Sequence, residues 1–201
     1  MVRGAVKDGE ATLRPVPDFE LRRFAGPKIH TEQLDGVRVA HLTDQHVGRV
    51  TSHAVQVGAV ELTNAQEPDL VVLSGDFVAH SQEFLDQLVD VIGRFDAPVI
   101  GVLGNHDHWS GADEVRWALR KGGAEVLDNA WTTVELKHQR LQVVGLDDAY
   151  TGNADIIETI DGFVTAPTFR HPDKLRRFGH LLRPLGVVED RLDLRAVSDD
   201  A

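Results

Sequence analysis

Three apolar, strand-like runs constrain the fold of this chain more than any other feature of its sequence. They lie at 37–42, 70–73 and 99–103, and each ends abruptly in polar residues. The middle run is uninterrupted in its apolar character, which is typical of a strand buried on both faces. Strands of this kind occur in parallel sheets whose two faces are covered by other elements. The three runs therefore predict a buried, largely parallel sheet.

The segments between these runs have the periodicity and the end signals of helices. A helix is expected over 51–67, ended by Pro68, a second from Ser81 onward and a third over 112–121. Short strands are expected near 19–21, 124–127, 131–136 and 140–146, and a short helix at 155–160. The alternation of strands and helices predicts an α/β fold with a parallel first half.

Length and patterning divide the chain into three parts. The 201 residues suggest one domain, which we expect over 31–168. Residues 1–30 lack clear periodicity and are expected to form a lead-in, and 169–201 are expected to be a divergent or disordered C-terminal segment.

Composition excludes several classes of function. The chain has no cysteine, so disulfides, zinc fingers and thiol catalysis are ruled out. Its net charge of −11 argues against a general nucleic-acid binder. No apolar run reaches the roughly 18 residues of a membrane span. We therefore expect a cytoplasmic protein, at most peripheral to a membrane.

Residues able to bind metal or transfer protons follow each of the three strands. Asp44 and His46 follow the first, Asp76 the second, and Asn105 and His106 the third. The ends of parallel neighbours meet at one sheet edge, where open α/β sheets bind their ligands. Positions i and i+2 of an extended chain share a side, so the first two residues can grip one ion together.

This donor set suits a hydrolytic metal site. Carboxylate, imidazole and amide ligands together favour divalent ions such as Mn, Fe, Zn or Mg. Two such ions about 3.5–4 Å apart clamp a phosphoryl group and lower the pKa of a shared water to about 7. Asp76 is placed to bridge the ions, and His106 to act as the catalytic residue that protonates a leaving oxygen.

The motifs resemble those of the calcineurin-like metallophosphoesterase family. The matching blocks are D-x-H at Asp44 and His46, G-D at Gly75 and Asp76, and G-N-H-D from Gly104 to Asp107. The context around the first block is similar to the branch whose bacterial members are YkuE-like or UDP-2,3-diacylglucosamine pyrophosphatase-like phosphoesterases. The resemblance implies a double β-sandwich flanked by helices (αββα), whose C-terminal part is incomplete here.

The resemblance also implies residue roles and a ligand class. Asp44 and His46 would hold the first of two divalent metal ions, Asp76 would bridge, and Asn105 would hold the second. Asn105, His106 and His80 are candidates for substrate contact. The substrate would be a phosphorylated small molecule or a lipid-like phosphoester.

The sequence departs from the family in its last quarter. The family places a later histidine in an H-x-P-D context and then a G-H-x-H motif. Here the late histidines are His171, followed by Pro172, and His180, which lacks a second histidine after it. Both are candidate ligands of lower weight. The segment is divergent, truncated or frameshifted, and the sequence leaves these alternatives open.

Three hypotheses of function follow. The first is a metal-dependent phosphoesterase acting on a phosphomonoester, phosphodiester or pyrophosphate bond. The second is a truncated or degenerate, non-catalytic member of the fold that serves as a binding module. The third is an α/β binding domain with coincidental motifs. Asp107 is expected to cap a turn, His108 to lie at the surface and Asp147 to belong to a turn.

Overall fold

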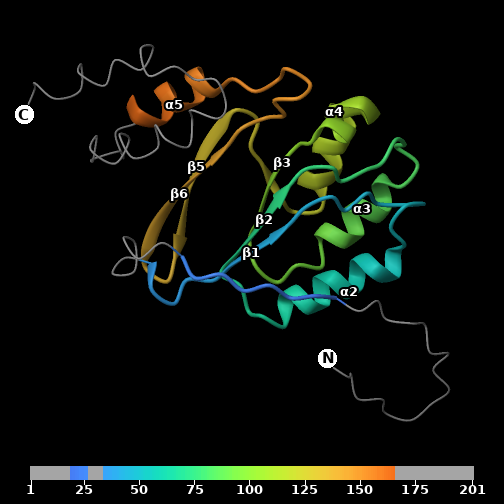
Figure 1. Ribbon diagram of the computed structural model, residues 1–201, viewed down its shortest axis with the longest axis horizontal. Coiled ribbons are helices and arrows are strands. Elements are labelled where there is room, and N and C mark those ends of the chain that lie inside the picture. Colours follow the sequence, from blue (N-terminus) through green and yellow to red (C-terminus); the bar gives the residue numbers. More distant parts are fainter. Residues whose placement is uncertain (1–18, 27–33, 166–201) are drawn as a thin grey trace, which may run out of the picture.

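The computed structural model describes residues 19–26 and 34–165 (Figure 1). The elements in chain order are β1 (Val39–Leu42), α2 (His53–Asn64), β2 (Leu70–Ser74), α3 (Leu85–Ile92), β3 (Val99–Val102), α4 (Asn105–Lys121), β4 (Glu125–Val126), β5 (Ala130–Leu136), β6 (Gln139–Gly145) and α5 (Ile156–Thr165). The predicted α/β alternation is confirmed.

The first four strands form one parallel sheet in the order β1-β2-β3-β4. Ala40 lies opposite Val71, and Leu73 lies opposite Gly101, so the sheet is in register from β1 to β3. The strands β5 and β6 form a separate antiparallel hairpin. The carboxyl ends of β1, β2 and β3 therefore share one edge, as the sequence predicted.

Two apolar layers hold the fold together, one on each face of the parallel sheet. Val71 and Leu73 of β2 belong to the core that includes Leu88 of α3 and Leu119 of α4. The neighbouring positions of β2 point the other way, and Leu70 packs in a second core with the hairpin. In Figure 1 helices α2, α3 and α4 lie on one side of the sheet, and the hairpin followed by α5 lies on the other. This is the expected αββα layering.

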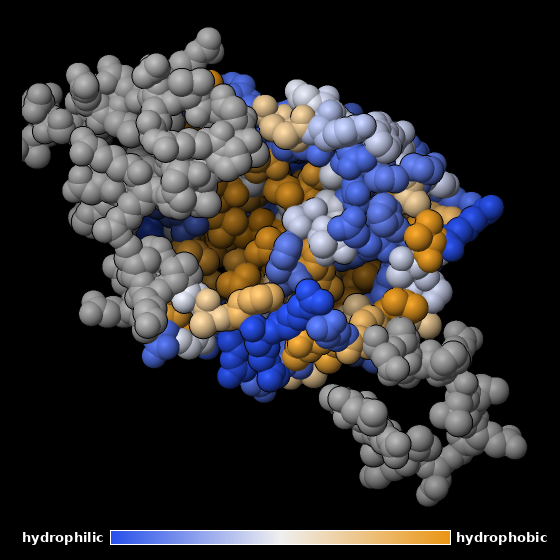
Figure 2. Space-filling model, in the orientation of Figure 1, coloured by the Kyte–Doolittle hydropathy of each residue, from blue (hydrophilic) through white to orange (hydrophobic). Residues whose placement is uncertain are grey.

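The layer between sheet and hairpin reaches the surface. Figure 2 shows apolar residues gathered in the middle of one face, over the region where Figure 1 places β1, β2 and the hairpin. Val39 of β1 and Val144 of β6 are among the exposed apolar side chains. The core on the helix side is better covered, because Val71, Leu88 and Leu119 are fully buried.

Several expected boundaries were wrong. Helix α4 begins at Asn105 rather than near 112, and a kink at Gly111, with φ of 111°, divides it. The described residues 19–26 contain no strand, so the strand expected near 19–21 is absent. Helices α2 and α3 are shorter than their patterns predicted, since apolar periodicity continues into the flanking turns. None of the helices in the described ranges is long and apolar enough to cross a membrane.

Asp69 ties the start of the sheet to the hairpin turn. Its carboxylate accepts a hydrogen bond of 2.7 Å from the Arg38 N–H and lies 3.0 Å from the Lys137 ammonium. Burial by itself raises the pKa of Asp69, but the Arg38 and Lys137 contacts outweigh it and bring the pKa below 3.8. The charged carboxylate is therefore the form that the folded protein favours.

We predict that Asp69→Asn destabilises the protein more at pH 7 than at pH 3. A pKa that is lower in the folded chain than in the unfolded chain stabilises the fold above the unfolded value, and this contribution is lost as the pH falls through the folded pKa. Urea unfolding of both proteins at pH 7, 5 and 3 measures the difference. A difference in the free energy of unfolding that stays constant across this range would contradict the prediction.

Candidate metal centre

The loop after β1 is bonded along its length to the loop after β2. The N–H groups of Asp44, His46 and Val47 donate to the carbonyls of the other loop at 3.2, 2.9 and 2.7 Å. The acceptors in the same order are Gly75, Asp76 and Phe77. These bonds continue the pairing of β1 and β2 beyond the strands, so the side chains of both loops are held at one edge.

Two glycines bring the loops after β2 and β3 into backbone contact. A Cβ on Gly75 would lie 2.5 Å from the Gly104 nitrogen, and a Cβ on Gly104 would overlap the Asp76 carboxylate. Because neither position carries a side chain, the Asp76 carboxylate reaches the start of α4. There it accepts the His106 N–H at 3.1 Å.

His46, Asp76 and His106 form the candidate metal cluster. One ligand atom of each lies within 4.8 Å of the others. The Nε2 atom of His46 is 3.9 Å from the Asp76 carboxylate and 3.8 Å from that of Asp44. The structure therefore brings together residues from all three strand ends, with the exposed Asp44 at the rim.

The backbone fixes which nitrogen of each cluster histidine can bind a metal. The Nδ1 atom of His106 lies 2.6 Å from the Ala79 carbonyl, and that of His46 lies 3.3 Å from the Val78 carbonyl. A carbonyl oxygen only accepts, so both Nδ1 atoms must carry the proton. Each Nε2 atom is then left with its lone pair, which is the form that coordinates divalent metals. The donor chemistry of the cluster thus fits a metal ion.

Asp107 is the buried support of this arrangement. Its carboxylate accepts the Gly104 N–H at 2.9 Å and the Val78 N–H at 3.1 Å. Burial raises its pKa to about 6, assisted by the nearby charge of Asp76 and opposed by the hydrogen bonds from the backbone. Asp107 therefore holds the turn between β3 and α4, as the sequence predicted.

Asp44 and His46 reach the cluster by a route that the sequence did not predict. The expected extended chain is wrong at this point, because both residues have left-handed backbone, with φ of 54° and 42°. Asp76 is also left-handed, with φ of 56°. Such conformations cost about 1–2 kcal/mol per residue outside glycine. The surrounding hydrogen bonds hold three candidate ligands in strained backbone, which is characteristic of functional sites.

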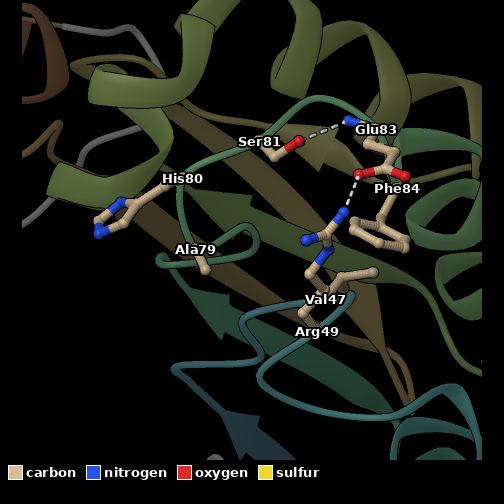
Figure 3. A pocket seen from close by; sticks show the side chains of 7 residues that line it. All are labelled: Val47, Arg49, Ala79, His80, Ser81, Glu83 and Phe84. Carbon is tan, nitrogen blue, oxygen red and sulfur yellow. Dashed lines mark hydrogen bonds and ion pairs between the residues drawn. The ribbon is translucent and has the colours of Figure 1, made fainter.

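His80 and a cavity lie beside the cluster. The His80 ring stacks on that of His106, with centroids 4.7 Å apart. A cavity of about 320 Å³ adjoins it, lined by Val47, Arg49, Ala79, His80, Ser81, Glu83 and Phe84. In Figure 3 the His80 ring points away from the Arg49–Glu83 ion pair on the other side of the cavity. His80 is thus placed where a substrate contact was expected.

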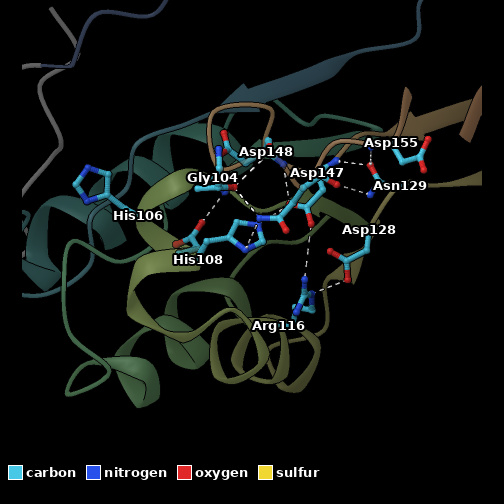
Figure 4. Close-up of polar contacts among 12 residues, drawn as sticks. Gly104, His106, His108, Arg116, Asp128, Asn129, Asp147, Asp148 and Asp155 are labelled. Atoms are coloured by element: carbon cyan, nitrogen blue, oxygen red, sulfur yellow. Dashed lines mark hydrogen bonds and ion pairs between the residues drawn. The ribbon is translucent and has the colours of Figure 1, made fainter. Parts of the chain in front are cut away.

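A buried polar network behind the cluster escaped the sequence analysis. The Nε2 atom of His108 donates to Asp147 at 2.6 Å, and the two side chains are only 13% and 6% exposed. Arg116 lies 3.8 Å from Asp147 and 2.5 Å from Asp128 (Figure 4). The expectation of a surface position for His108 is wrong, because the loop after β6 folds over α4. Only the position of Asp147 directly after a strand hinted at this pair.

The remaining candidates are placed as follows. Asn105 is the first residue of α4 and directly precedes His106, partly buried at the same sheet edge. His171 and His180 lie outside the described residues, so their assignment as ligands stays a prediction.

Comparison with known proteins decides the family. The family model described as calcineurin-like phosphoesterase matches residues 37–191. The chain belongs to this family. Family members are metal-dependent phosphoesterases, which agrees with the donor set at the carboxyl edge of the parallel sheet.

Relatives of this metallophosphoesterase are distant and longer. An uncharacterized metallophosphoesterase of Aquifex aeolicus is 24% identical over 163 residues, which cover 74% of this chain and 61% of the relative. Phosphodiesterase YaeI of Escherichia coli is 27% identical over 121 residues, covering 57% and 45%. A solved archaeal phosphodiesterase aligns with a TM-score of 0.39 at 19% identity, over 59% of this chain and 69% of that one. The chain thus spans under two thirds of both curated relatives.

We predict that Gly75→Ala destabilises the protein by about 3 kcal/mol or more, because it adds a backbone collision of overpacking type to left-handed strain. Gly123→Ala is the matched control. Gly123 also has positive φ, 102°, but a Cβ there would meet nothing within 4 Å. Its cost should be roughly 1 kcal/mol, the strain alone. Equal losses of unfolding free energy in urea titrations would contradict the proposed contact between the loops.

We predict that Asp147→Ala costs about 3 kcal/mol, because it leaves His108 and Arg116 without a buried acceptor. Asp113→Ala is the control. Asp113 also pairs with Arg116, at 2.8 Å, but its side chain is 94% exposed. Exposed ion pairs contribute little, so this variant should keep the midpoint of thermal unfolding nearly unchanged. The network would be refuted by two variants of equal stability.

Proposed function

We propose that this chain hydrolyses a phosphodiester bond with the help of two divalent metal ions. The observation that carries the proposal is the cluster of His46, Asp76 and His106, in which both imidazoles turn an unprotonated Nε2 toward a shared carboxylate. Three left-handed backbones and two close glycines maintain this cluster, a cost that a purely structural turn would not require.

The metal ligands would come from all three loops. Asp44 and His46 would hold one ion, Asn105 the other, and Asp76 would bridge them. Bound divalent ions would lower the pKa of a water toward about 7 and offset the charge of a phosphoryl group. Exposed Asp44 and partly buried Asp76 leave the site open on one side, where substrate would enter.

His106 would act on the leaving group. The Ala79 carbonyl holds Nδ1–H and so fixes the ring with Nε2 toward the cluster. When a proton also occupies Nε2, the ring would donate it to the oxygen that departs from phosphorus. The N–H of the same residue meets the Asp76 carboxylate, so the proton donor and the proposed bridging ligand are fixed to each other.

Phosphodiesters are the bond type best supported by a relative. YaeI, which matches 57% of this chain, is named a phosphodiesterase. The substrate would be a phosphorylated small molecule or a lipid-like ester, within the YkuE-like branch, and the protein would act in the cytoplasm or at a membrane surface. A net charge of −11 disfavours long nucleic acids as substrates.

We predict that the Mn²⁺-loaded protein hydrolyses bis(p-nitrophenyl) phosphate and that EDTA abolishes this activity. Asp76→Asn and His106→Ala should each lower kcat/KM by at least about 100-fold, the usual contribution of one proton-transfer group or more. His138→Ala is the control, because His138 is exposed in the hairpin turn between β5 and β6 and lies outside the proposed site.

Metal analysis separates the enzyme from a non-catalytic member of the fold. Close to two equivalents of metal per chain support the proposal, and Asp76→Asn should reduce this content. Undiminished activity in both site variants would refute the assigned roles. A protein that binds no metal and shows no hydrolysis would instead be the degenerate binding module.

A further inference from the structure

Two exposed aromatic rings continue outward from the candidate catalytic histidine. Trp109 is three residues after His106 on α4, and their ring centroids are 5.0 Å apart. Tyr150 lies 6.0 Å from Trp109, with the ring planes at 75°. We term Trp109 and Tyr150 the aromatic corner. Their exposure is large for such residues, 56% and 80%.

The loop that carries Tyr150 is built to hold it there. The Thr151 N–H donates to the Asp148 carboxylate at 2.6 Å, and the Asn153 N–H donates to the Asp148 carbonyl at 3.0 Å. The Asn153 side chain lies 3.3 Å from Nδ1 of His108. Together with the His108–Asp147 pair, these contacts anchor the loop to α4. Tyr150 is therefore an exposed ring on a fixed turn.

A second tryptophan on the same helix shows why the position of Trp109 is distinctive. Trp117 is 54% exposed, close to the value for Trp109. The ammonium of Lys121 lies over its ring, 4.5 Å from the centroid, so a neighbour on α4 uses its π face. Trp109 instead contacts the rings of His106 and His80 at the cluster.

We propose that the aromatic corner binds a planar aromatic group in the alcohol portion of the phosphoester substrate. The inference rests on the proposed function, in which His106 faces the leaving oxygen. The group attached to that oxygen then emerges beside Trp109. Two rings near a right angle offer one face for stacking and one for an edge contact, which are the two favourable geometries for a flat ring. An aryl ester and a nucleotide both supply this chemistry.

Direct binding of non-hydrolysable phosphonates tests the inference. Calorimetric titration of the Mn²⁺-loaded full chain compares phenylphosphonate with cyclohexylphosphonate, which has a similar size and no π face. We expect about tenfold tighter binding of the phenyl compound, the usual scale for one aromatic stack. Adenosine 5′-monophosphate against ribose 5-phosphate, titrated in the same way, shows whether a nucleobase is accepted as the planar group.

Matched variants assign the preference to one ring. Trp109→Leu should bring the phenyl-to-cyclohexyl ratio close to one, Trp109→Phe should keep most of it, and Trp117→Leu should leave it intact. No preference in the wild type, or an unchanged preference in Trp109→Leu, overturns the inference while phosphate binding still supports the function. Failure of inorganic phosphate and both phosphonates to bind overturns the proposed function and this inference with it.

Discussion

The contact between the Gly75 and Gly104 backbones is the constraint on which the candidate metal centre depends. A parallel sheet brings its strand ends to one edge, but it leaves neighbouring loops a side chain apart. Removing both side chains lets the loops touch, and Asp76 then reaches the first turn of α4. The carboxylate is thus fixed to the helix that carries His106. Family membership is consistent with this edge serving as a metal site.

Histidines at this edge divide into two groups by the partner of one nitrogen. His46 and His106 donate Nδ1–H to backbone carbonyls, which leaves Nε2 available at the cluster. His108, two residues further along α4, donates Nε2–H to Asp147 and faces the loop after β6. One residue type therefore supplies ligands on one side of the helix and an anchor on the other. The anchor holds the turn that presents Tyr150.

The sequence predicted the parts of the fold that depend on apolar patterning. The runs at 70–73 and 99–103 are buried in the sheet, so their burial is written in their composition and their polar ends had to meet at one edge. The start of α4 at Asn105 was missed, because Asp107 and the loop contacts stabilise that turn and periodicity does not. The His108–Asp147 pair was missed for a similar reason. It joins residues far apart in the chain, and nothing local marks it.

The left-handed backbone of Asp44, His46 and Asp76 has a consequence for the history of such chains. Glycine adopts this conformation without strain, so each of the three positions would gain stability from losing its side chain. Selection for stability and selection for ligands therefore act in opposite directions at the same residues. A lineage that no longer needs the metal should drift toward glycine there. Aspartate and histidine at these positions thus distinguish chains still under selection for metal binding from those that keep only the fold.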